Sequence, residues 1–213
     1  MMYYLPGCDV RRNHPEAVSK MQDYIAKQSV GVIECCRKNL SFVCDDDEII
    51  QTCTLCDMVL HERVPQAKIT SIYEYLLRTG FDFPDHSGRV MTVQDCFRTK
   101  HNPVLLDSIR ECLRRMHIEI VEMDSCREKT EFCGVWLNNP IAPDLPALVP
   151  NLSERLESMR HLLPAEEQKK KMEEWVSHYK TDEIAVYCNG CERGVKLGGG
   201  HAVHMIELLS ANL

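Results

Sequence analysis

The sequence of 213 residues lacks any apolar run close to the roughly 20 residues that a membrane-spanning helix needs. Its start, from Met1 to Cys8, lacks the charged segment and the long apolar stretch of a secretory signal peptide. No basic stripe is available to neutralise phosphates, and the formal net charge is −7. These absences predict a cytoplasmic protein with no membrane span and no nucleic-acid partner.

Two cofactor motifs are also missing. No Gly-x-Gly-x-x-Gly fingerprint follows a predicted strand, and the run Gly198–Gly200 does not match it. We therefore expect that this chain itself binds neither flavin nor nicotinamide. The chain also lacks the Cys-x-x-Cys-x-x-Cys run of ferredoxins.

Cysteine, in contrast, is abundant, with twelve residues in the chain. Hydrophobic residues make up 44% of the sequence, which is enough to build a core without disulfides. In a reducing compartment, many regularly spaced cysteines indicate metal binding or redox chemistry. The cysteines are therefore the candidate functional residues.

Nine of these cysteines form two copies of one pattern. The first copy comprises Cys8, Cys35, Cys36, Cys53 and Cys56, and the second comprises Cys96, Cys133, Cys188 and Cys191. Pro15 and Pro103 each lie seven residues after the first cysteine of their copy. The apolar segments 32–34 and 120–122 also lie at equal offsets. An internal repeat of this kind sets the architecture.

Each copy alternates apolar runs typical of strands with segments of helical periodicity. Strands are predicted at 3–5, 30–34, 49–52, 90–93, 118–123 and 184–187, and helices at 15–28, 69–78, 103–116 and 203–209, with another after Cys53. This alternation predicts an α/β protein of two pseudo-repeated Rossmann-like halves with mostly parallel sheets. The thiols then fall at the carboxyl ends of strands, where open α/β sheets bind ligands.

The boundary between the halves is expected at the turn-rich segment 81–88, which divides the chain into residues 1–84 and 85–213. The second half carries an insertion, residues 138–181. Its proline-rich start, 138–150, predicts an extended loop, and two amphipathic helices follow. These helices are interpreted as a lid, a partner surface or a hairpin packed on the sheet.

Thiolates are soft ligands that select iron–sulfur clusters, zinc or copper(I). With its paired copies of a distant cysteine, a central cysteine motif and a Cys-x-x-Cys, the chain resembles the cysteine-rich CCG family. That family includes the cysteine-rich subunit of heterodisulfide reductase and the iron–sulfur subunits of glycolate oxidase, lactate oxidation complexes and anaerobic glycerol-3-phosphate dehydrogenase. The resemblance extends from about Tyr3 to Leu209.

The resemblance implies an iron–sulfur redox protein, an oxidoreductase subunit that passes electrons or reduces a thiol or disulfide. Each five-cysteine set of the family can hold a non-cubane [4Fe-4S] cluster, which implies such a cluster at the first set here. A ferredoxin-type electron carrier or a flavoprotein would be the partner.

The chain departs from the family pattern in both copies. Arg37 replaces the triplet glycine of the first copy, and Phe132 replaces the first triplet cysteine of the second. The second set therefore has four thiols, enough for a cubane cluster or a tetrahedral zinc. Cys126 is a candidate substitute ligand.

Other interpretations stay open at this point. Zinc at one or both sets, or a degenerate member without clusters, would make the chain a structural or interaction module. A metal-free thiol enzyme would use the pair Cys35–Cys36. Cys44 and Cys112, outside the repeat, are expected to be buried apolar residues. His14, His61, His201 and His204 are expected to face solvent or cap helices.

Overall fold

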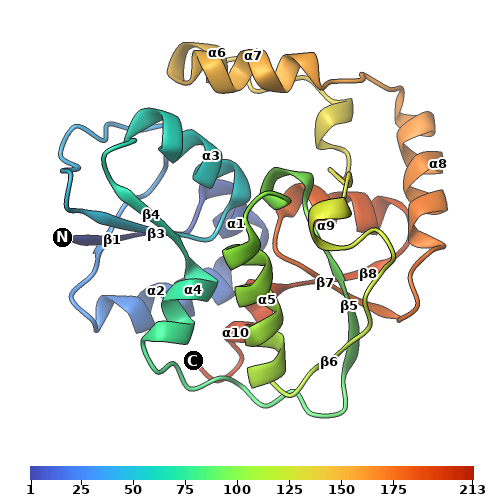
Figure 1. Cartoon of the computed structure of the whole chain (residues 1–213), viewed down its shortest axis with the longest axis horizontal. Coiled ribbons are helices and arrows are strands. Elements are labelled where there is room, and N and C mark those ends of the chain that lie inside the picture. The colour runs from blue at the N-terminus through green and yellow to red at the C-terminus, as the bar shows by residue number, and fades with distance from the viewer.

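Two four-stranded, all-parallel sheets form the centre of the protein, one in each half of the chain (Figure 1). We describe them from a computed structural model that covers all 213 residues. The first sheet contains β1 (Met2–Leu5), β2 (Gly31–Val32), β3 (Glu48–Gln51) and β4 (Lys68–Ser71), in the order β2-β1-β3-β4. The second contains β5 (Val90–Gln94), β6 (Glu119–Ile120), β7 (Glu183–Val186) and β8 (His201–His204), in the order β6-β5-β7-β8. The predicted fold class, with its two repeated halves, is confirmed.

The helices repeat in the same order. The first half has α1 (Cys8–Asn13), α2 (Pro15–Ala26), α3 (Thr54–Arg63) and α4 (Ile72–Arg78). Their counterparts are the 3₁₀ turn η1 (Phe97–Thr99), α5 (Pro103–Arg115), α9 (Asn189–Leu197) and α10 (Met205–Leu209). Proline opens both α2 and α5, as expected for the first helical turn.

Several predicted boundaries are wrong. The sequence pattern predicts helix throughout 69–78 and 203–209, but each segment begins with the end of a strand, β4 and β8. β-Branched residues at these starts favour the extended form, and the side chains of Ser71 and His204 then cap the helices that follow. The strands predicted at 30–34 and 118–123 shorten to the two-residue edge strands β2 and β6. The short helix α1 has no counterpart among the predicted elements.

The two halves share one hydrophobic core. A continuous cluster of 38 buried residues includes apolar side chains of both sheets. Helix α2 packs on α10, and α4 packs on α5. Likewise α1 contacts α9, and α3 contacts η1. These pairs relate the halves by an approximate twofold arrangement that sets α3 and α9 close together.

The insertion in the second half crosses to the first half. It follows the 3₁₀ turn η3 (Trp136–Asn138) and contains α6 (Leu145–Leu148), α7 (Pro150–Ser158) and α8 (Ala165–Val176). Helix α7 packs on α3, while α8 packs on α9 (Figure 1). The two helices are therefore not a hairpin on one sheet. Each covers a different helix, α3 or α9, that carries a Cys-x-x-Cys motif at its amino end. The predicted extended loop at 138–150 is wrong in its last part, which forms α6.

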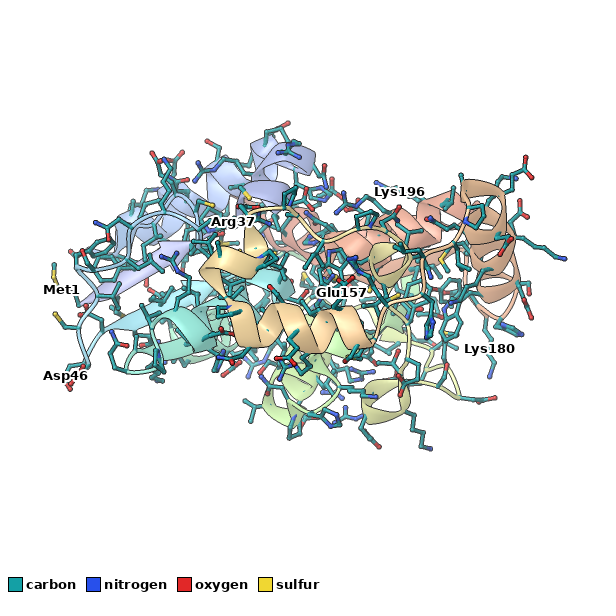
Figure 2. All side chains as sticks on the ribbon, turned by 90° about the horizontal axis from the view of Figure 1, so that it is seen from above. Met1, Arg37, Asp46, Glu157, Lys180 and Lys196 are labelled. Carbon is teal, nitrogen blue, oxygen red and sulfur yellow. The ribbon has the colours of Figure 1, made fainter.

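Apolar and polar contacts fix α7 on the first half. Leu152 and Leu156 are buried in a 14-residue cluster with side chains of α3. The Glu62 carboxylate accepts hydrogen bonds from the backbone amides of Asn151, at 3.0 Å, and Leu152, at 2.7 Å. Helix α7 has no cap from its own N-cap side chain, so Glu62 supplies one from the other half. Figure 2 views this side of the molecule, with Glu157 on α7 and Arg37 near α6.

A polar cluster at the end of α1 joins the two halves. The His14 ring lies 3.0 Å from a carboxylate oxygen of Glu192 and 3.0 Å from one of Glu207. Burial opposes the charged form of His14, but these two contacts outweigh it and raise the His14 pKa. The His204 ring packs against the His14 ring in a tilted arrangement, with ring centroids 4.6 Å apart. The expectation that His14 faces solvent or caps a helix is wrong, because His14 is buried and its side chain makes no cap hydrogen bond to α2. The capping role expected of His204 is confirmed.

We expect Leu156→Ala in α7 to lower the free energy of unfolding by about 2–5 kcal/mol, because the side chain is fully buried. Leu162→Ala is the matched control, since Leu162 is 62% exposed and should change little. Urea denaturation measures both. Equal stability of the two variants would show that α7 does not pack on α3.

The stability should also fall at acid pH because of His204. Burial, with the neighbouring charge of His14, lowers the His204 pKa to about 3. Below the unfolded value of about 6.5, the unfolded chain binds a proton that the folded chain does not. Stability is thus lost as the pH falls from about 6.5 toward 3.

The test compares wild type with His204→Asn, which keeps a helix-capping side chain without the titration. Between pH 7 and pH 5 the wild type should lose about 2 kcal/mol more than the variant. His61→Asn, at an exposed position, should follow the wild type. Parallel pH profiles for all three proteins would rule out this role of His204.

Candidate functional site

A cavity of about 330 Å³ lies between the two halves, where α3 and α9 begin. Both helices start directly after a strand end, so their free backbone amides face the region in which the strands of each sheet end. The thiols that line the cavity come from both copies of the repeat: Cys8, Cys36, Cys53, Cys56 and Cys188. The two cysteine sets therefore open on one site.

Three buried thiols of the second set form the tightest group. The sulfurs of Cys96, Cys188 and Cys191 all lie within 4.8 Å of one another. Cys96 follows β5, Cys188 is the N-cap residue of α9, and Cys191 lies in the first turn of that helix. The thiols thus come together because two neighbouring strands end side by side.

Cys188 is the member of this group that favours the thiolate. Hydrogen bonds from Cys191 and Cys96, with the nearby Arg98 charge, lower its pKa well below the usual value. The Arg98 guanidinium donates to the Cys188 sulfur at 3.2 Å. Burial raises the pKa of Cys96 and of Cys191, so both remain protonated donors to Cys188 without a metal.

Cys133 lies beside this group but not within it. Its thiol donates to the carbonyl of Gly134 at 3.2 Å. Gly134 has φ +59°, and a Cβ there would lie 1.8 Å from the carbonyl oxygen of Gly190. Only glycine allows this loop to approach α9 so closely, which explains the glycine after Cys133. In the first copy Arg37 replaces it, with no positive φ.

The first set is more open. Hydrogen bonding with Cys56 lowers the pKa of Cys36 and of Cys53. Cys8 is exposed, and Cys35, its hydrogen-bonding neighbour, is half-buried. Burial, followed by the charge of Cys35, raises the pKa of Cys8. All five predicted residues of the first set are neighbours, with Cys8 and Cys35 toward solvent.

Contacts across the boundary join the two sets. Thr54, the residue after Cys53, donates its hydroxyl to Cys188. Arg98 of the second half donates to the Thr54 hydroxyl at 3.3 Å and to Cys188. The amino ends of α3 and α9 are therefore in contact through the Thr54 hydroxyl and the Arg98 guanidinium.

The remaining cysteines are not part of this site. Cys126 is surrounded by Glu122, Arg110 and Asp95 rather than by thiols, so it is not a substitute ligand. Cys112 is fully buried among apolar residues, as expected. The expectation that Cys44 is buried is wrong, because it is exposed in a loop between β2 and β3.

Sequence reasoning missed three side chains of the site. Arg98 lies two residues after Cys96, where the first copy has Val10, and its guanidinium lies over the Trp136 ring at 4.0 Å. Asn189 lines the cavity at the start of α9. The departure from the repeat at Arg98 is a signal that could have identified it.

A buried ion pair holds the backbone that carries Cys96. Asp95 and Arg110 are almost completely buried and meet at 2.7 Å. Asp95 also accepts from the backbone amide of Arg127 and from the Tyr187 hydroxyl. The Tyr187 hydroxyl in turn accepts from the Cys96 amide at 3.0 Å. This network fixes Cys96 relative to β7, and so relative to Cys188.

The thiols present fit a soft metal centre. Cys96, Cys188 and Cys191 could hold a metal or a cluster, and so could Cys36, Cys53 and Cys56. In a tetrahedral zinc site, Zn–S bonds of about 2.3 Å put the sulfurs about 3.8 Å apart. The spacing in the second set is compatible with that geometry.

Comparison with protein families, with curated proteins and with solved structures finds no match to this chain. None of its helices combines the length and apolar character needed to cross a membrane. The resemblance to the CCG family therefore depends on the cysteine pattern described above. The division into domains at 84/85 also stays a prediction.

Proposed function

We propose that this chain is an iron–sulfur redox protein of the heterodisulfide-reductase type, a subunit of a cytoplasmic oxidoreductase. The observation that carries the proposal is the single cavity lined by four thiols of the first set and by Cys188 of the second. Cys8, Cys35, Cys36, Cys53 and Cys56 would hold the first centre, and Cys96, Cys133, Cys188 and Cys191 the second. A cluster bound there would supply the electron transfer.

The chain's own residues prepare the site for such a centre. The amino ends of α3 and α9 direct free amides and positive dipole ends toward the thiols, which favours thiolates. Arg98 adds a positive charge beside Cys188. Helices α7 and α8 cover α3 and α9, which limits access of water to the second set. Cys8 and Cys35 leave one side of the first set open to a substrate.

The proposed role requires an electron donor. The chain has no ferredoxin-type cysteine run, so a ferredoxin-type carrier subunit or a flavoprotein would deliver electrons. The substrate would be a thiol or a disulfide that reaches the open side of the first set.

A second candidate is zinc at the second set. The compact spacing of Cys96, Cys188 and Cys191, within 4.8 Å, favours a single tetrahedral ion there. The chain would then be a structural or interaction module, without electron transfer at that set.

Metal analysis of anaerobically purified protein tests both candidates. We expect about four to eight irons with matching sulfide, as for one or two four-iron clusters. Cys191→Ser should lower the iron content and the visible absorbance, because it removes a ligand of the buried group. Cys112→Ser is the matched control, since Cys112 is equally buried but lies among apolar residues.

Other results would decide against the iron–sulfur proposal. Zinc near one per chain, lost in Cys191→Ser and kept in Cys112→Ser, would establish the second candidate. Protein that binds neither metal, even after anaerobic reconstitution with iron and sulfide, would contradict both.

A further inference from the structure

Arg98 is a half-buried cation without a carboxylate partner. Its hydrogen bonds run from Nη1 to Thr54 and to Cys188. Its Nε and Nη2 atoms are buried and have no partner. Unpaired guanidinium nitrogens are costly inside a protein, so such atoms indicate a group that the isolated chain does not supply.

Asn189 is a second unpaired group on the same cavity. The residue is 5% exposed, and neither its amide nitrogen nor its amide oxygen has a partner. It occupies the first position of α9, a nine-residue helix whose amino end borders the cavity. The helix dipole and the free amides at this end favour an anion.

The charged side chains that line the cavity are mostly positive, which also favours an anion. Its lining contains four arginines, Arg12, Arg37, Arg98 and Arg193, and one acidic residue, Asp9. The three outer arginines have carboxylate partners, since Arg12 and Arg193 pair with Asp9, and Arg37 pairs with Asp144. Arg98 is therefore the one arginine of the lining without a carboxylate partner, in a chain whose net charge is −7. A cavity with this lining attracts small anions.

The size and the remaining walls limit the ligand. A cavity of about 330 Å³ lies at the lower end of small-molecule sites. Trp136 and Leu55 give the lining an apolar part, and thiols of both sets also line the cavity. A ligand that satisfies both the anion-binding groups and the thiols has a carboxylate at one end and a sulfur at the other.

We propose that this cavity binds a small thiol that carries a carboxylate, with the carboxylate held by Arg98 and Asn189. The sulfur of the ligand then faces Cys53 and Cys188, which border the cavity from the two sets. The role of these thiols as a redox centre rests on the proposed function, but the recognition of the carboxylate does not.

Isothermal titration of the anaerobically purified protein tests this assignment with three probes of similar size. Mercaptoacetate has both groups, 2-mercaptoethanol lacks the charge, and acetate lacks the thiol. We expect mercaptoacetate to bind at least about tenfold more tightly than 2-mercaptoethanol, as a charge-assisted hydrogen bond provides. Acetate should bind more weakly than mercaptoacetate.

Variants locate the carboxylate. Arg98→Met and Asn189→Leu should each weaken mercaptoacetate binding about tenfold or more and leave 2-mercaptoethanol binding unchanged. Arg115→Met, on the exposed face of α5, is the control and should bind as the wild type does. The Asn189 side chain makes no hydrogen bond to a thiol, so its variant remains informative if Arg98→Met fails to fold.

The outcomes separate the two proposals when iron is measured on the same samples. Tight mercaptoacetate binding that depends on Arg98, in protein without iron, supports the anion site and contradicts the proposed function. Equal affinity for mercaptoacetate and 2-mercaptoethanol, or unchanged binding in both variants, overturns the anion site whether iron is present or not.

Discussion

The convergence of α3 and α9 on one point is the constraint on which the rest of the structure depends. Each helix has a cysteine as its N-cap residue, and the two starts touch through Thr54, Cys188 and Arg98. Thiolates brought so close repel one another, and burial adds to the penalty. Two helix amino ends and the Arg98 guanidinium oppose that repulsion. The approximate twofold packing of the halves is what brings these stabilising groups to the same place.

The two copies of the repeat have diverged around this point. Val10 in the first copy corresponds to Arg98 in the second, so the cationic group is present on one side alone. Gly134 lets the Cys133 loop pack against α9, whereas Arg37 at the corresponding position pairs with Asp144. The first set is consequently open and the second closed. The same fold thus provides a solvent-facing thiol set and a buried one.

The sequence was informative where the signal is local. Apolar strand runs, the prolines that open α2 and α5, and the position of each Cys-x-x-Cys after a strand all follow from short-range patterns. Those patterns determine the α/β class and place thiols at strand ends. The length of short edge strands such as β2 could not be predicted, because it is set by pairing with a single neighbouring strand and not by composition. Asn189 and Arg98 line one cavity, His14 is buried, and α7 lies on the first half. All three features depend on contacts between distant segments, which no local period encodes.

The position of α7 also affects the order in which the chain can fold during synthesis. Residues 1–84 contain every strand of the first sheet, yet the apolar face of α3 is covered by Leu152 and Leu156 from far along the chain. The amino-terminal half emerges from the ribosome first, as in vectorial folding generally. This half cannot complete its core until the end of α7 has also been translated. The nascent chain therefore exposes the apolar face of α3 for that interval.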